Sequence, residues 1–175
     1  MMKEVEERIS FIFGRRSIRA YTAETVSDEA VQKLLEAAMA APSAAAKDPW
    51  RFVVVRNREM LKAVRTALPN GQMLGSAALG IVVCGDQDAA HDQQIGYLVQ
   101  DCAAATENLL LCAQILGLGA CWLGVYPREQ RIKSIQKILG LRDPVLPIAC
   151  IAIGHPAERK EPRTRFNPAF VRTER

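Results

Sequence analysis

The sequence has few of the side chains from which metal sites are built. Its 175 residues include only two histidines, His91 and His155, and no carboxylate cluster stands near either of them at ligand spacing. Protein-bound zinc is usually held by closely spaced His, Cys and carboxylate side chains. The sequence therefore predicts no metal site held by protein ligands.

Long apolar runs and signal sequences are also missing. No apolar stretch reaches the roughly 18 residues expected of a membrane-spanning helix. The N-terminus, MMKEVEERIS, lacks the apolar core and the cleavage site of a signal peptide. The phosphate-binding patterns GxGxxG and GxxxxGKS/T are absent too, which counts against Rossmann and P-loop nucleotide sites. We expect a cytoplasmic chain with no membrane partner.

The cysteines show no pattern of disulfides or metal ligands. They number five, no pair has CxxC spacing, and they lie in apolar stretches such as IVVCGD and LPIACIAIG. Neither histidine adjoins a cysteine, so no activated nucleophile is indicated. This pattern is typical of buried free thiols in a reducing compartment.

The remaining composition favours one globular domain over residues 1–175. Hydrophobic residues make up 49% and charged residues 24%, enough for a sizeable core. Apolar periodicity and capping residues predict helices over 4–13, 28–41, 57–68, 95–116 and 128–139, and strands over 52–55, 79–84, 121–125 and 146–153. The fold class expected is α+β.

Positive charge is concentrated near the two ends of the chain. Lys and Arg number 23 against 19 Asp and Glu, which gives a net charge of only +4. One basic group is Arg15, Arg16 and Arg19; the other is Arg159, Lys160, Arg163 and Arg165. Such clusters suit a discrete anion better than a long polyanion. Spacing alone leaves open a solvated loop and tail, or a basic module that binds nucleic acid.

Four segments in order resemble the FMN-dependent nitroreductases. They are RRSIRAY, APSAAAKDPWRFVVV, QDCAAATENLLLCAQILGLGACWLGVYP and LPIACIAIGHPAERKEPRTRF. The resemblance runs from about residue 11 to residue 166. It implies a nitroreductase-like α+β fold, with a small, mixed, mostly antiparallel sheet flanked by helices, in an intertwined homodimer. The helix over 95–116 would lie in the dimer interface, and residues 155–175 would form an arm on the partner subunit.

The resemblance also implies an FMN site between the subunits. The basic N-terminal segment and the distal pair would hold the phosphate, ribityl chain and pyrimidine side, with Lys160 a weaker candidate. A loop of the other subunit would cover the ring, and a backbone segment would approach the flavin N5. The implied cofactor-binding residues are Arg15, Arg16, Ser17, Arg19, Pro42, Ser43, Ala44, Leu123, Gly124, Arg163 and Arg165.

Two positions depart from the family pattern. Ala46 and Asp48 stand where many members have Asn and Gln, which removes a polar contact near the ring. Asn70 or Gln72, in the loop before Met73, could supply a replacement. Trp50 and Trp122 each adjoin a strand and are expected to pack in the core.

The implied reaction is a ping-pong hydride transfer with no catalytic protein side chain. NADH or NADPH would reduce FMN, which would then reduce a nitroaromatic, a quinone or a similar small electron-poor acceptor. The residues do not choose between the two donors. Alternatives within the fold are an FMN-dependent dehalogenase and a flavin-transforming enzyme. The alternative from another class is a basic anion- or nucleic-acid-binding module without redox activity.

Overall fold

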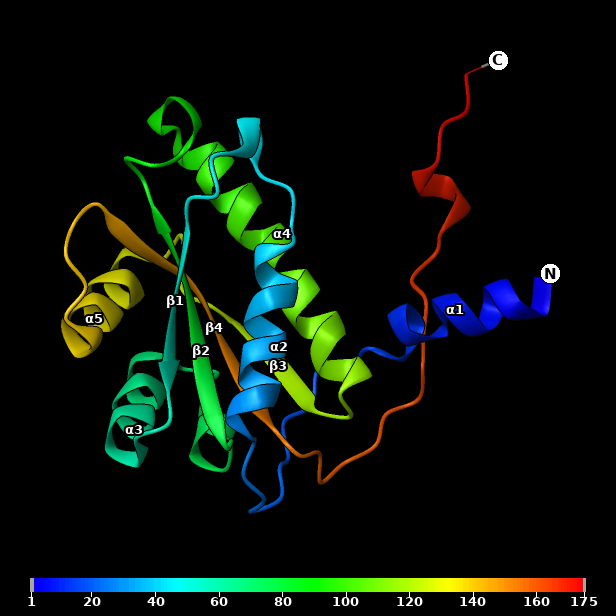
Figure 1. Ribbon diagram of the computed structural model, residues 1–175, viewed down its shortest axis with the longest axis horizontal. Helices are drawn as coiled ribbons and strands as arrows, with labels where there is room; N and C mark the ends of the chain where they lie inside the picture. The colour runs from blue at the N-terminus through cyan, green and yellow to red at the C-terminus, as the bar shows by residue number, and fades with distance from the viewer. Residues whose placement is uncertain (1, 175) are drawn as a thin grey trace.

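Four strands form the sheet at the centre of the computed structural model, which describes residues 2–174 (Figure 1). The spatial order is β1 (Trp50–Val55), β2 (Leu79–Asp86), β4 (Val145–Gly154) and β3 (Gly119–Gly124), and each neighbouring pair is antiparallel. An isolated bridge between Ser17 and Ala120 runs parallel. The expected small, mostly antiparallel sheet is confirmed. Residues 1 and 175, the ends of the predicted domain, lie outside the described residues.

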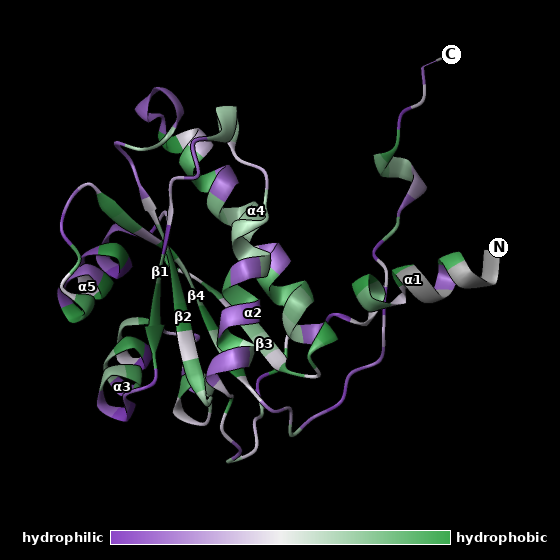
Figure 2. Ribbon diagram, in the orientation of Figure 1, coloured by the Kyte–Doolittle hydropathy of each residue, from purple (hydrophilic) through white to green (hydrophobic). Residues whose placement is uncertain are grey.

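Helices cover both faces of the sheet. α2 (Asp28–Met39) and α4 (Ile95–Ile115) pack on one face, with Ile81 and Val83 of β2 beneath them. α3 (Arg58–Ala67) and α5 (Glu129–Leu139) cover the other face, over Val82 and Cys84. Successive side chains of a strand point to opposite faces. The central strands are therefore apolar at nearly every position (Figure 2).

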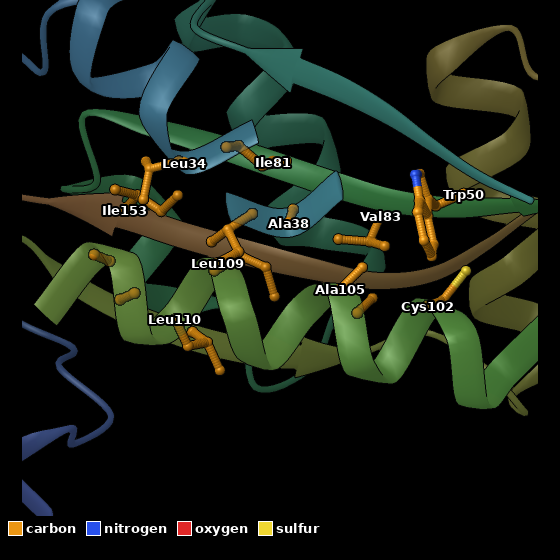
Figure 3. Close-up of a cluster of buried hydrophobic side chains, with 14 of the residues drawn as sticks. Leu34, Ala38, Trp50, Ile81, Val83, Cys102, Ala105, Leu109, Leu110 and Ile153 are labelled. Atoms are coloured by element: carbon orange, nitrogen blue, oxygen red, sulfur yellow. The ribbon is translucent and has the colours of Figure 1, made fainter. Parts of the chain in front are cut away.

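The core under α2 and α4 is closely packed and contains one of the two tryptophans. Leu34 of α2 and Leu109 of α4 meet Ile153, and Trp50 lies at the end of the same cluster (Figure 3). The prediction that Trp50 packs in the core is confirmed. The prediction for Trp122 is wrong: its side chain is 38% exposed on the edge strand β3. Its neighbours Cys121 and Leu123 are buried and face the other side of the sheet.

The helix ends follow the capping residues in the sequence. Ser27 Oγ accepts the N–H of Ala30 at 3.1 Å, and Asn57 Oδ1 accepts that of Met60 at 3.0 Å. α5 ends at Gly140, whose φ of 65° lies in the left-handed region that glycine adopts without strain. Residues 2–174 also form four short 3₁₀ turns: Ala44–Ala46, Gln72–Gly75, His91–Gln93 and Pro168–Phe170.

The two end segments of the chain extend away from the sheet and meet near Phe13. α1 (Met2–Gly14) projects to one side, and the C-terminal segment passes beside it (Figure 1). The N–H of Arg163 donates to the carbonyl of Phe13 at 3.1 Å. Phe166 and Phe170 are 75% and 83% exposed. Across residues 2–174, no helix combines the length and the apolar character needed to cross a bilayer.

Candidate functional site

The basic segment after α1 is fixed to the sheet by its apolar members. Ile18 donates its N–H to the carbonyl of Ala120 at 3.0 Å, which aligns the segment with β3. A Cβ on Gly119 would lie 2.7 Å from Ile18 Cγ2, so glycine is required for this close approach. The hydroxyl of Tyr21 lies 2.7 Å from the Ile18 carbonyl and 3.1 Å from that of Ala152. Burial raises the pKa of Tyr21, so the hydroxyl stays protonated and able to donate.

The chain after β4 turns back along this segment. The N–H of Thr22 donates to the carbonyl of His155 at 2.9 Å, and that of Ala157 to the carbonyl of Ala20 at 2.8 Å. Tyr21 and Pro156 form an antiparallel bridge between them. The first part of the predicted arm therefore pairs with its own chain.

Glu158 and Lys160 link the two basic groups. Glu158 Oε1 accepts the backbone N–H of Arg19 at 2.5 Å and lies 3.1 Å from Lys160 Nζ. Lys160 Nζ in turn donates to the carbonyl of Ser17 at 2.7 Å. The Arg19 N–H, followed by Lys160, holds the pKa of the Glu158 carboxyl below its usual range. We name Glu158 and Lys160, with their contacts to Ser17 and Arg19, the tail clamp.

The basic residues from both ends, apart from Arg159, line one cavity of about 350 Å³. Arg163 and Arg165 are brought there by the tail, and Arg16 donates to the carbonyl of Glu161. Repulsion from Arg165 and then from Arg16 lowers the pKa of the Arg163 guanidinium, which indicates positive charge in excess of its counter-charge. The lining residues are Ile12, Arg15, Arg16, Ser17, Arg19, Lys160, Arg163 and Arg165.

This geometry favours a discrete anion. The cations converge on one hollow instead of spreading over an open face, and a phosphate group binds best to several charge-assisted donors at once. One carboxylate already approaches the cluster, because Glu107 Oε1 of α4 lies 3.3 Å from Arg15 Nε. Glu107 thereby holds Arg15 in place from the helix behind it.

A second cavity, of about 490 Å³, adjoins the first and shares Arg19 with it. Its floor includes Leu123 and Gly124 of β3, and a Cβ on Gly124 would meet no atom within 4 Å. Arg131 Nη1 of α5 donates to the Gly124 carbonyl at 2.8 Å. The other lining residues are Leu68, Pro69, Asn70, Gln72, Met73, Cys121, Trp122 and Arg131.

Three of the expected site residues line neither of these cavities in the described chain. Pro42, Ser43 and Ala44 lie in the loop between α2 and β1, where the N–H of Ala44 donates to Asp101 Oδ1 at 2.9 Å. Asp101 is 5% exposed, and its Oδ2 has no hydrogen-bond partner among the described residues. Within its own chain this loop is therefore held by α4.

The same loop contains unusual backbone angles. Ala45, Ala46 and Asp48 have φ values of 50°, 52° and 49°, in the left-handed region that costs non-glycine residues free energy. Asp48 is stabilised there, since Ser43 Oγ donates to its Oδ1 at 2.6 Å and accepts its N–H at 3.0 Å. At Ala46 the side chain provides no such compensation.

Trp122, Arg131 and Ile12 are lining residues that sequence reasoning missed. Strand alternation places Trp122 on the opposite face of the sheet from the buried Cys121 and Leu123, but it does not predict that the side chain is exposed. Arg131 and Ile12 are ordinary helix residues, and no sequence signal distinguishes them.

None of the five cysteines has the lowered pKa of an activated nucleophile. All five lie within the described residues as free thiols. Burial raises the pKa of Cys84, Cys102 and Cys150 to about 12, so each stays protonated at neutral pH. Within residues 2–174, no group of three or more His, Cys, Asp or Glu side chains could hold a metal ion.

Comparison with known proteins gives consistent matches over most of the chain. The family model described as "Nitroreductase family" matches residues 12–72 and 60–155. A protein of Archaeoglobus fulgidus with the provisional name NADH dehydrogenase/NAD(P)H nitroreductase is 45% identical over 174 residues, covering 98% of this chain and 99% of its own.

Solved structures agree with this match. A provisionally named nitroreductase from Desulfovibrio desulfuricans, in complex with FMN, has a TM-score of 0.83 at 34% identity and covers 95% of this chain and 96% of its own. An FMN-dependent nitroreductase from Clostridium difficile has a TM-score of 0.87 at 29% identity, with coverage of 95% and 99%.

Proposed function

The chain belongs to the nitroreductase family, and we propose that it is an FMN-dependent NAD(P)H oxidoreductase that reduces nitroaromatics, quinones or similar electron-poor small molecules. The observation that carries this proposal is the convergence of the two basic groups on one cavity beside Leu123 and Gly124. The two groups lie near opposite ends of the sequence, so it is the fold that brings them to the same cavity.

The residues present fit FMN. A phosphate monoester carries close to two negative charges at neutral pH, and the first cavity offers an excess of cations whose mutual repulsion is visible at Arg163. The adjoining cavity has open space above Gly124, where a Cβ would meet nothing. A planar ring system can therefore approach the backbone of β3 closely.

Each group in the site has a distinct role. Arg15, Arg16, Arg163 and Arg165 would neutralise the phosphate, and Ser17 would add a neutral hydrogen bond. Arg19 lines both cavities, and its charge between them favours additional negative charge on a bound ring. When bound, FMN would supply the redox chemistry for a ping-pong transfer of reducing equivalents from NADH or NADPH to the acceptor.

We further propose a homodimer in which residues 1–175 form one FMN-binding domain. The support is the apolar surface that one subunit leaves open at both chain ends, including Phe11 and Phe13 of α1 and Phe166, Phe170 and Val171 of the tail. Residues 164–174 would be the part of the arm that reaches the partner. The loop with Pro42, Ser43 and Ala44 would cover the flavin of the other subunit.

A cytoplasmic location forms part of the proposal. Its support is that five free thiols match a reducing compartment.

Purification and anaerobic titration test the function. The purified protein should be yellow with one FMN per chain, should bleach on addition of NADH or NADPH, and should recover its colour with a quinone or a nitroaromatic. A colourless protein that takes up no added FMN would overturn the proposal. Light scattering of the full chain and of a variant lacking residues 164–175 tests the dimer. If both proteins have the same oligomeric state, the arm is not needed for dimerisation.

A further inference from the structure

A third cavity lies next to the second one, on the other side of the loop that follows α3. It has a volume of about 370 Å³ and is lined by Lys62, Arg65, Thr66, Leu68, Pro69 and Gln72. Leu68, Pro69 and Gln72 also line the cavity above Leu123 and Gly124. Hence one short loop separates the ring site from a basic pocket on α3, which lies on the same face of the sheet as α5 (Figure 1).

The two cations of this pocket are not neutralised. In the part of the chain that the structure describes, neither Lys62 nor Arg65 lies within ion-pair distance of a carboxylate. Arg65 Nε donates to Gln72 Oε1 at 2.9 Å, which ties the guanidinium to the loop shared by the two cavities. Lys62 and Arg65 are three residues apart on one helix and so lie on the same side of it.

We infer that the pocket formed by Lys62 and Arg65 binds the 2′-phosphate of NADPH, so that this chain prefers NADPH to NADH. The inference rests on the proposed function, which places the nicotinamide at the ring site. The 2′-phosphate belongs to the adenosine end of the dinucleotide, far from the nicotinamide. The pocket with Lys62 and Arg65 likewise lies beyond the shared loop from Leu123 and Gly124. A planar guanidinium and an ammonium side by side suit a phosphate monoester.

Kinetics with both donors test the inference on the FMN-loaded enzyme. We expect a lower KM for NADPH than for NADH in the wild type. Lys62→Gln should raise the KM for NADPH on the order of tenfold, with kcat, the KM for NADH and the FMN content unchanged. Lys62→Arg keeps the charge and should restore the preference. Lys137→Gln is the matched control, since Lys137 is an exposed lysine of α5 outside these cavities.

A binding measurement separates this inference from the proposed function. Calorimetry on the same protein measures the affinity for adenosine 2′,5′-bisphosphate and for 5′-AMP. It therefore tests the pocket without any redox step. The bisphosphate should bind more tightly than 5′-AMP, and Lys62→Gln should abolish the difference. Equal KM changes for NADPH and NADH, no donor preference in the wild type, or equal binding of the two nucleotides would overturn the inference. Failure of the proposed function would appear separately, as absence of FMN or of bleaching by either donor.

Discussion

The contact between Asp101 and Ala44 joins helix α4 to the loop that follows α2. The Asp101 carboxylate accepts the N–H of Ala44 at 2.9 Å while its second oxygen, also buried, has no partner among the described residues. A buried carboxylate oxygen without a hydrogen bond costs free energy. The contact fixes the start of the loop that we propose covers the partner's flavin.

Asp101→Ala should destabilise the protein by about 1–3 kcal/mol, because the Ala44 N–H then loses its acceptor. Asp101→Asn keeps an acceptor oxygen in the same place and should cost less. Thermal or urea unfolding of the two variants checks this order. If Asn proves as damaging as Ala, the contact with Ala44 is not what makes Asp101 important.

The tail clamp predicts a pH effect with a definite sign. The pKa of Glu158 is lowered in the folded state, first by the Arg19 N–H and then by Lys160. Its contribution to stability is therefore present above the unfolded-state pKa, about 4.3, and is lost as the pH falls through the lower folded-state value. Between about pH 5 and about pH 3, Tm should fall more steeply in the wild type than in Glu158→Gln.

Glu161→Gln is the control for that experiment. It makes the same charge change three residues further along the tail, where only the backbone carbonyl of Glu161 takes part in a described contact. Its Tm profile should follow the wild type. Parallel profiles for wild type and Glu158→Gln would mean that the clamp does not contribute to stability.

Arg19→Ala should weaken FMN binding about ten- to hundredfold, since Arg19 lines both the first cavity, which we propose binds the phosphate (the phosphate cavity), and the second, which we propose binds the ring. Fluorescence quenching of added FMN measures the Kd. Arg159→Ala removes a tail arginine that does not line the phosphate cavity and should leave the Kd close to that of wild type. Stoichiometric FMN retained by Arg19→Ala would argue against this site.

Ala46→Gly should stabilise the protein by about 0.5–1 kcal/mol. Relief of the left-handed φ of 52° outweighs the greater freedom of glycine in the unfolded chain. Ala37→Gly is the matched control, because Ala37 lies in helix α2, where the same change costs about 1 kcal/mol. Tm measurements on both variants check this: Ala46→Gly should raise Tm and Ala37→Gly should lower it. A lower Tm in both variants would contradict the prediction.

The sequence predicts the helices and strands of this fold well because their signals are local. Ser27 and Asn57 cap helices where their hydroxyl and amide oxygens predict, and the apolar runs of β2 and β4 form the two central strands. The basic segments could be found the same way, as clusters. Their convergence was implied only by resemblance to a family, because it depends on backbone pairing between residues 20–22 and 155–157.

Other parts of the site carry no readable signal. Ala45 and Ala46 adopt left-handed angles that alanine gives no reason to expect. Trp122 looks like a core residue by type, and its exposure depends on what covers its face of β3, which is a property of the fold. The contact of Asp101 with Ala44 joins residues 57 positions apart and has no pattern in sequence.

The contact between Arg16 and Glu161 spans 145 positions of the chain. During synthesis on the ribosome, every strand of the sheet emerges before the tail that completes the phosphate cavity. A nascent chain stopped at Gly154 has all the residues of its core and none of the distal cations. On the proposed site, flavin would therefore be captured only after the chain has been synthesised past Arg165.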